Sequence, residues 1–161
     1  LLRESRIERL VDVRTIPRSR FNPQFNKDTL PDALAGAGIS YEHLTALGGR
    51  RGRSRDVPPE VNAFWTHESF HSYADYALSS QFREGLDHLI DDGRQRRCAI
   101  MCSEAVWWRC HRRIVADYLL ARGETVIHIM APGRVEPATL TPGAVVRSDG
   151  TVVYPPAQPS I

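Results

Sequence analysis

Short apolar runs alternate along the chain with segments in which hydrophobic residues recur every three or four positions. The apolar, β-branched runs predict buried strands over 10–14, 39–44, 97–102 and 125–130. The helical spacing predicts helices over 69–79, 80–93 and 110–122, and one that begins at Asp28 or Thr29 and ends at Gly36 to Gly38. Ser80 is the predicted N-cap of its helix. Residues 3–8 are expected to be the end of a further helix.

Strands that alternate with helices are typical of the α/β class. We therefore predict a three-layer domain in which a mainly parallel sheet is flanked by helices, followed by a small C-terminal hairpin over 142–154. With 161 residues, the chain is expected to be a single domain over 1–161. Segment 48–66 is rich in Gly, Arg and Pro and is predicted to be a flexible loop.

The composition is that of an ordinary globular protein, with 42% hydrophobic and 25% charged residues. No apolar run approaches the roughly 20 residues that span a bilayer, so no membrane partner is expected. Three cysteines are an odd number, which disfavours a complete disulfide framework and favours a reducing, cytoplasmic setting. A net charge of +2 disfavours a dedicated non-specific nucleic-acid binder.

Arginine dominates the basic residues, because Lys27 is the only lysine among 21. Genomic base composition explains the preference for arginine but not its clustering. The arginines fall in three groups: Arg14, Arg18 and Arg20; Arg50, Arg51, Arg53 and Arg55; Arg109, Arg112 and Arg113. Loops that follow parallel strands lie at one edge of the sheet, so we expect the groups to converge there. Guanidinium groups bind phosphate and carboxylate well, which predicts an anion site.

Segment 102–112, CSEAVWWRCHR, joins a predicted strand to a predicted helix and supplies the candidate catalytic residues Cys102, Glu104 and His111. A thiol near a helix N-terminus and several arginines favours the thiolate, the form that acts as a nucleophile. The alternative is a buried structural thiol. Glu104 is a candidate acid–base group or an ion-pair partner of an arginine. His111 is a candidate base, or caps or packs against the helix.

A metal ion is an alternative role for Cys102, Glu104, Cys110 and His111, because zinc accepts sulfur, nitrogen and oxygen ligands. Their spacing matches no recognised zinc pattern, and the neighbouring arginines oppose a cation. The chain also has no dinucleotide-binding GxGxxG. The expectation is therefore a site without a metal or other cofactor.

Four stretches resemble, in this order, the family called domain of unknown function 488: VDVRTIPRSRFNPQFN (11–26), ISYEHLTALGGRR (39–51), YADYALSSQF (73–82) and AIMCSEAVWWRCHRRIVADYLLARG (99–123). The resemblance covers nearly the whole chain and implies an α/β fold without an agreed reaction. Members begin with a further strand, of the TIGHS kind, which this chain is expected to lack. Rhodanese-like features are only distant, because six residues rather than five separate Cys102 from Arg109.

The positions that the resemblance marks carry no role that transfers, so we assign them from their chemistry. We predict that a subset of them binds the ligand: Asp12, Arg14, Arg18, Asn22, Tyr41, Gly49, Arg50, Tyr73, Tyr76, Arg109 and Arg112. Arginine would hold an anion, glycine would let the loop approach it, and tyrosine would stack on a ring.

These features favour a cofactor-independent enzyme or ligand-binding domain that acts on a phosphate-bearing molecule, a nucleotide or a nucleic acid. One alternative is a non-catalytic module whose basic loop at 48–55 meets nucleic acid or an acidic partner. Another is a metal-dependent enzyme that uses the thiols and the imidazole of segment 102–112.

Overall fold

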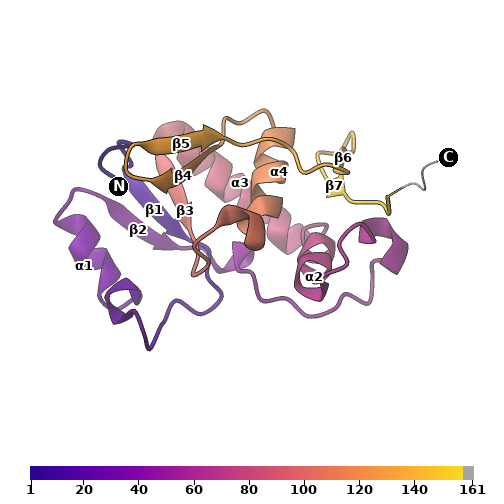
Figure 1. Cartoon of the computed structure of the whole chain (residues 1–161), viewed down its shortest axis with the longest axis horizontal. Coiled ribbons are helices and arrows are strands. Elements are labelled where there is room, and N and C mark those ends of the chain that lie inside the picture. Colours follow the sequence, from indigo (N-terminus) through magenta and orange to yellow (C-terminus); the bar gives the residue numbers. More distant parts are fainter. Residues whose placement is uncertain (158–161) are drawn as a thin grey trace.

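The computed structural model describes residues 1–157 and has mixed α/β architecture (Figure 1). Its longer elements, in chain order, are β1 (Arg9–Asp12), α1 (Leu30–Ala35), β2 (Ser40–His43), α2 (Glu68–Tyr76), α3 (Ser80–Gln95), β3 (Cys98–Met101), α4 (Arg112–Ala121), β4 (Ile127–Ala131), β5 (Arg134–Pro137), β6 (Val145–Val146) and β7 (Val152–Val153). Short 3-10 turns are η1 (Pro23–Phe25), η2 (Thr45–Leu47), η3 (Pro59–Asn62) and η4 (Trp107–Arg109).

A parallel sheet in the order β2-β1-β3 forms the centre of the fold. Leu10 in the middle strand is level with Tyr41 of β2 and Ala99 of β3. All three strands end at the same edge, and Arg14, Leu44 and Cys102 follow close behind them. The α/β prediction is confirmed, and the loops after the strands start from one edge as expected.

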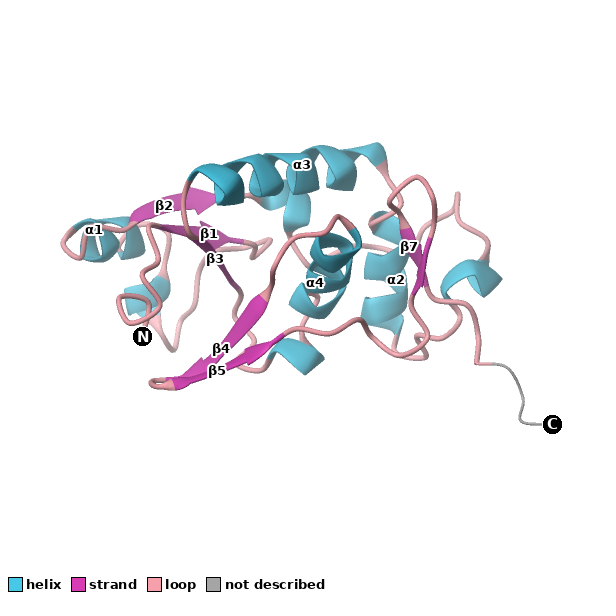
Figure 2. Ribbon diagram, turned by 90° about the horizontal axis from the view of Figure 1, so that it is seen from above, coloured by secondary structure: helices cyan, strands magenta, loops and turns pink. Residues whose placement is uncertain are grey.

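The two faces of β1 enter two different hydrophobic cores. Val11 and Val13 pack with residues of α2, α3 and α4 in the larger core. Leu10 packs on the opposite face with Leu30 and Leu34 of α1. In Figure 2, α3 runs along one side of the sheet and the β4–β5 hairpin lies beyond the other. This arrangement produces the predicted layers around the sheet, because neighbouring residues of a strand point to opposite faces.

The strand predicted at 125–130 is present as β4, but it does not join the parallel sheet. It pairs antiparallel with β5, with Ile127 level with Pro137. Gly133 has a φ of 69°, a left-handed conformation that reverses the chain directly after β4. The predicted C-terminal hairpin is confirmed as β6 and β7, and Gly150 turns it with a φ of 85°.

Several helix boundaries differ from the prediction. Residues 3–6 form turns rather than a helix end. The side chain of Ser79, not Ser80, caps α3 by accepting from the backbone N–H of Phe82 over 3.3 Å. The same helix passes through Gly93 and ends at Gln95. None of the helices within residues 1–157 has the length and hydrophobicity needed to cross a bilayer.

Candidate functional site

A cavity of about 310 Å³ opens beyond the carboxyl ends of β1 and β3. Its volume is in the range of small-molecule sites. The loop after β1, the segment after β2, the start of α2 and segment 102–112 all contribute to its walls. The lining residues are Arg14, Thr15, Ile16, Arg18, Gly49, Arg50, Ser69, Phe70, Cys102, Ser103, Glu104, Arg109, Cys110 and His111.

Each of the three arginine groups contributes to this cavity. Arg18 comes from the first group, Arg50 from the second and Arg109 from the third. Within residues 1–157, no ion pair or side-chain hydrogen bond engages these three guanidiniums. Three arginines from distant parts of the chain therefore line one hollow, and none of them is held in an ion pair within the described residues.

The remaining members of the groups have structural partners. Arg51 lies over the ring of Tyr76, 3.8 Å from its centroid, and donates to the carbonyl of Thr45. Arg113 donates to the hydroxyl of Thr141. Arg112 donates to the backbone carbonyl of Glu104 and to the sulfur of Cys110, over 2.5 and 3.3 Å. These contacts stabilise the walls and the loop that carries Cys102.

Arg14 and Asp12 form a buried bidentate pair under the cavity. Nε and Nη2 of Arg14 donate to the two carboxylate oxygens over 2.8 and 2.7 Å, and Tyr41 donates its hydroxyl to the same carboxylate. Burial raises the pKa of Asp12, but the hydrogen bonds from Arg14 and Tyr41 outweigh it and hold that pKa below its usual value. Burial is also the main cause that raises the pKa of Tyr41. Asp12 and Tyr41 are not among the residues that line the cavity. They hold the side chain of Arg14, which does line it, in a fixed position.

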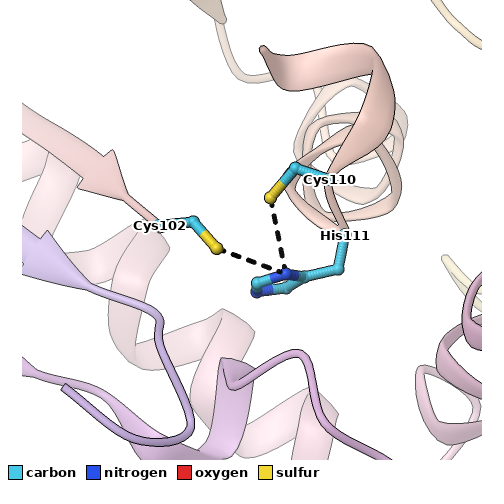
Figure 3. Close-up of side chains that lie close together, drawn as sticks. All are labelled: Cys102, Cys110 and His111. Atoms are coloured by element: carbon cyan, nitrogen blue, oxygen red, sulfur yellow. Dashed lines mark hydrogen bonds between the residues drawn. The ribbon is translucent and has the colours of Figure 1, made fainter. Parts of the chain in front are cut away.

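Cys102, Cys110 and His111 meet at the cavity, as Figure 3 shows. Nδ1 of His111 lies 3.8 Å from Sγ of Cys102 and 3.5 Å from Sγ of Cys110. Nε2 of the same imidazole lies 3.0 Å from the backbone carbonyl of Val13. A carbonyl oxygen only accepts, so Nε2 carries a proton, and in the neutral ring Nδ1 presents its lone pair to the two sulfurs.

The two thiols have pKa values that move in opposite directions. The neighbouring thiol of Cys110 is the main cause that lowers the pKa of Cys102, helped by His111 and the backbone N–H of Glu104 and opposed by burial. The same thiol–thiol contact and burial raise the pKa of Cys110. The more exposed sulfur therefore carries the negative charge first.

Tight packing holds the imidazole of His111 in place. The ring of Tyr73 lies against it, with centroids 4.9 Å apart, and the Tyr73 hydroxyl donates to the carbonyl of Leu47. Gly49 lies beside Nδ1 and Cε1 of the His111 ring. A Cβ added to Gly49 would lie 2.7 Å from Cε1 and closer still to Nδ1. Only glycine leaves the space beside Nδ1 open.

The remaining residues predicted to be catalytic or ligand-binding lie partly in the cavity wall and partly outside it. The exposed Glu104 lines the cavity, and its backbone carbonyl rather than its carboxylate meets an arginine. Tyr76 donates its hydroxyl to the carbonyl of Ala46 below the site. Asn22 lies exposed in the loop after β1, outside the lining. Of the predicted ligand-binding set, the cavity thus brings together Arg14, Arg18, Gly49, Arg50 and Arg109.

Some residues of the site carry no recognisable signal in the sequence. Thr15, Ser69 and Phe70 line the cavity, and Thr15 also accepts from the backbone N–H of Arg50 over 2.9 Å. His43 lies 2.7 Å from the carbonyl of Arg14 and fixes the loop after β1. The position of His43 at the end of β2 was the available clue, because strand ends point to the site edge.

A wider, open hollow of about 620 Å³ lies between α3, α4 and the C-terminal hairpin. Of its three arginines, two have side-chain partners: Arg83 donates to the carbonyl of Asp149, and Arg122 to the carboxylate of Asp87. The described residues that line it include neither cysteine nor histidine. The candidate catalytic cysteine and histidine therefore lie at the cavity beyond the sheet edge and not at this hollow.

The comparisons with known proteins give a family but no reaction. The family model described as domain of unknown function DUF488 matches residues 1–119. No curated protein and no solved structure gives a significant match.

Proposed function

The chain belongs to the family described as domain of unknown function DUF488, and we propose that it binds a small oxyanion, such as a nucleotide phosphate, in the cavity beyond β1 and β3. One contrast carries the proposal. Arg14, Arg51 and Arg112 have protein partners, whereas Arg18, Arg50 and Arg109 line the cavity without one. A hollow lined by unpaired guanidiniums favours an anion as its occupant.

The thiol of Cys102 is the candidate nucleophile of the metal-free site. Nδ1 of His111 is placed to accept the thiol proton while Sγ forms a bond to an electrophilic phosphorus or carbon of the bound molecule. The leaving group would depart with the electrons of the broken bond. Glu104, which lines the same cavity, is the candidate that protonates it. These steps require no other cofactor.

Binding of the anion is tested by titration calorimetry with phosphate, pyrophosphate and AMP. We expect R18A and R109A each to weaken binding about 10-fold or more, because each removes a charged hydrogen bond worth roughly 1.5–3 kcal/mol. R20A is the matched control, since Arg20 is in the loop of Arg18 but outside the lining. Equal affinities for all four proteins would refute the proposal.

The nucleophile is tested by alkylation with iodoacetamide at one fixed pH, followed by mass spectrometry. We expect Cys102 to react faster than Cys98, and bound phosphate to slow its reaction. The H111Q variant should react several-fold more slowly, because it removes the proton acceptor. A rate that is unchanged in H111Q would reject the role of His111.

Exposed aromatic residues favour nucleic acid as a second candidate ligand. The side chain of Phe21 is 93% exposed, and Phe25 and Trp108 are also exposed, all in segments that carry arginines. Bases stack on such rings while guanidiniums contact the backbone. Binding of single-stranded oligonucleotides should then weaken with salt and in F21A. An acidic protein partner would share the salt dependence but not the effect of F21A.

The three cysteines are unpaired in the structure. Free thiols fit the reducing, cytoplasmic setting that we expect for this protein.

A further inference from the structure

We infer that Cys102, Cys110 and His111 form a three-ligand zinc site, with Sγ, Sγ and Nδ1 as donors and the fourth position open to the cavity. Glu104 is not a ligand in this arrangement. Only the occupant of the fourth position rests on the oxyanion binding proposed above.

The distances between the donor atoms fit a tetrahedral ion. Zn–S bonds of about 2.3 Å and Zn–N bonds of about 2.0–2.1 Å at the tetrahedral angle place sulfur and nitrogen ligands about 3.6 Å apart. In the structure, Nδ1 lies 3.8 and 3.5 Å from the two sulfurs, and all three donor atoms lie within 4.8 Å of one another. Figure 3 shows both sulfurs directed to the same nitrogen.

The surroundings of the donors are those of a metal site. Nε2 of His111 donates to the carbonyl of Val13, which leaves Nδ1 free and fixes the ring orientation. The backbone N–H and Nε of Arg112 both donate to Sγ of Cys110, over 3.4 and 3.3 Å. Such contacts stabilise a thiolate ligand. Two thiolates neutralise Zn²⁺, so Arg112 acts on the ligand and does not oppose the ion.

Gly49 keeps one side of the cluster open. A Cβ at this position would occupy the space directly beside Nδ1. The cavity that begins there is lined by Arg18, Arg50 and Arg109. An oxyanion held by these arginines could complete the coordination, as a water or substrate does in three-ligand zinc sites.

A second cluster of possible metal ligands is already occupied by an arginine. Glu42, His88 and Asp92 also lie close together. Arg9 already donates to both carboxylates, 2.7 Å from Asp92 and 3.3 Å from Glu42. A guanidinium thus fills the place of a cation there, whereas at the cysteine–histidine cluster Arg112 contacts only one of the three donor atoms, Sγ of Cys110.

The inference is tested with the full chain, prepared without a histidine tag and kept reduced. Cobalt(II) is added, and thiolate-to-cobalt charge-transfer and tetrahedral d–d bands are recorded. Zinc affinity is then measured by competition with a chromophoric chelator. We expect one ion per chain, and a loss of affinity of more than about 100-fold in C102S and in H111Q. C98S is the matched control and should bind as the wild type does.

Circular dichroism verifies that each variant is folded. Since Cys110 is buried, the partly exposed Cys102 provides the decisive variant. No charge-transfer band in the wild type, or equal zinc affinity in C102S, would overturn the inference. R18A should keep zinc but bind phosphate weakly, and metal-free C102S should keep phosphate, so the two proposals fail separately. Zinc should also protect Cys102 from alkylation, and a loaded protein that reacts at the metal-free rate would contradict the site.

Discussion

The imidazole of His111 spans from the start of α4 to the end of β1, where its Nε2 donates to the backbone carbonyl of Val13 over 3.0 Å. This contact joins residues that are 98 positions apart. It ties segment 102–112 to the central strand and sets the direction of Nδ1. The geometry of both thiols relative to the ring therefore depends on this one hydrogen bond and on the packing around it.

The G49A variant should displace the imidazole of His111. A Cβ at position 49 would overlap Nδ1 and Cε1, and overpacking of this kind costs about 1–3 kcal/mol. We expect a lower free energy of unfolding in urea and weaker zinc binding. G52A is the control in the same loop, because nothing lies within 4 Å of a Cβ there. Equal effects of the two substitutions would argue against a specific contact.

Acid should destabilise the protein through Asp12. The pKa of this carboxyl is lower in the folded protein than in the unfolded chain, so its stabilising effect is present above about pH 4 and is lost as the pH falls further. Unfolding measured by urea between pH 3 and pH 6 should show this slope, and D12N should flatten it. A D12N protein with the full wild-type slope would assign the acid sensitivity to other carboxyls.

Removal of the Arg14 side chain should lower the free energy of unfolding more than removal of the Arg18 side chain. R14A leaves the carboxylate of Asp12 buried without its partner, a change that costs about 3–5 kcal/mol in buried pairs. R18A removes an exposed side chain that has no partner within residues 1–157, so the free energy of unfolding should change by less than about 0.5 kcal/mol. Thermal unfolding of both variants measures the difference, and similar losses would contradict it.

The cap of α3 can be assigned by two neighbouring serine variants. S79A removes the hydroxyl that accepts from the N–H of Phe82 and should cost about 1 kcal/mol. S80A changes the first residue of the helix and should have little effect. If S80A were the more damaging variant in urea unfolding, the helix would begin one residue later than the structure indicates.

The position of segment 102–112 should also depend on Trp107. Its ring stacks on His128 of β4 at 4.2 Å, and its Nε1 donates to Glu136 of β5 over 3.1 Å. W107A should loosen this attachment, raise the alkylation rate of metal-free Cys102 and increase amide exchange over 103–110. W108A is the control, since Trp108 is the more exposed of the pair. Unchanged exchange in W107A would show that the hairpin does not hold the segment.

The sequence predicted the central strands because their apolar runs are short and buried, and it predicted the site edge because polar loops follow them. It did not predict the partner of β4, since an apolar run does not say which strand it pairs with. Nor did the sequence show that Arg14 has a structural partner whereas Arg18 has none among the described residues. The guanidinium of Arg14 donates to Asp12, which lies two residues before it. The role of Gly49 arises from a neighbour 62 positions away, and only the fold brings the two together.

The alternation of β1 between two cores has a consequence for how this protein tolerates insertions and deletions. Adding or removing one residue within Arg9–Asp12 would turn every following side chain to the opposite face. The valines would then meet α1, the carboxylate would enter the core beneath α3, and the carbonyl that orients His111 would shift. Changes in chain length should therefore be accepted around Gly52 and Arg53, which are exposed, but not in this strand.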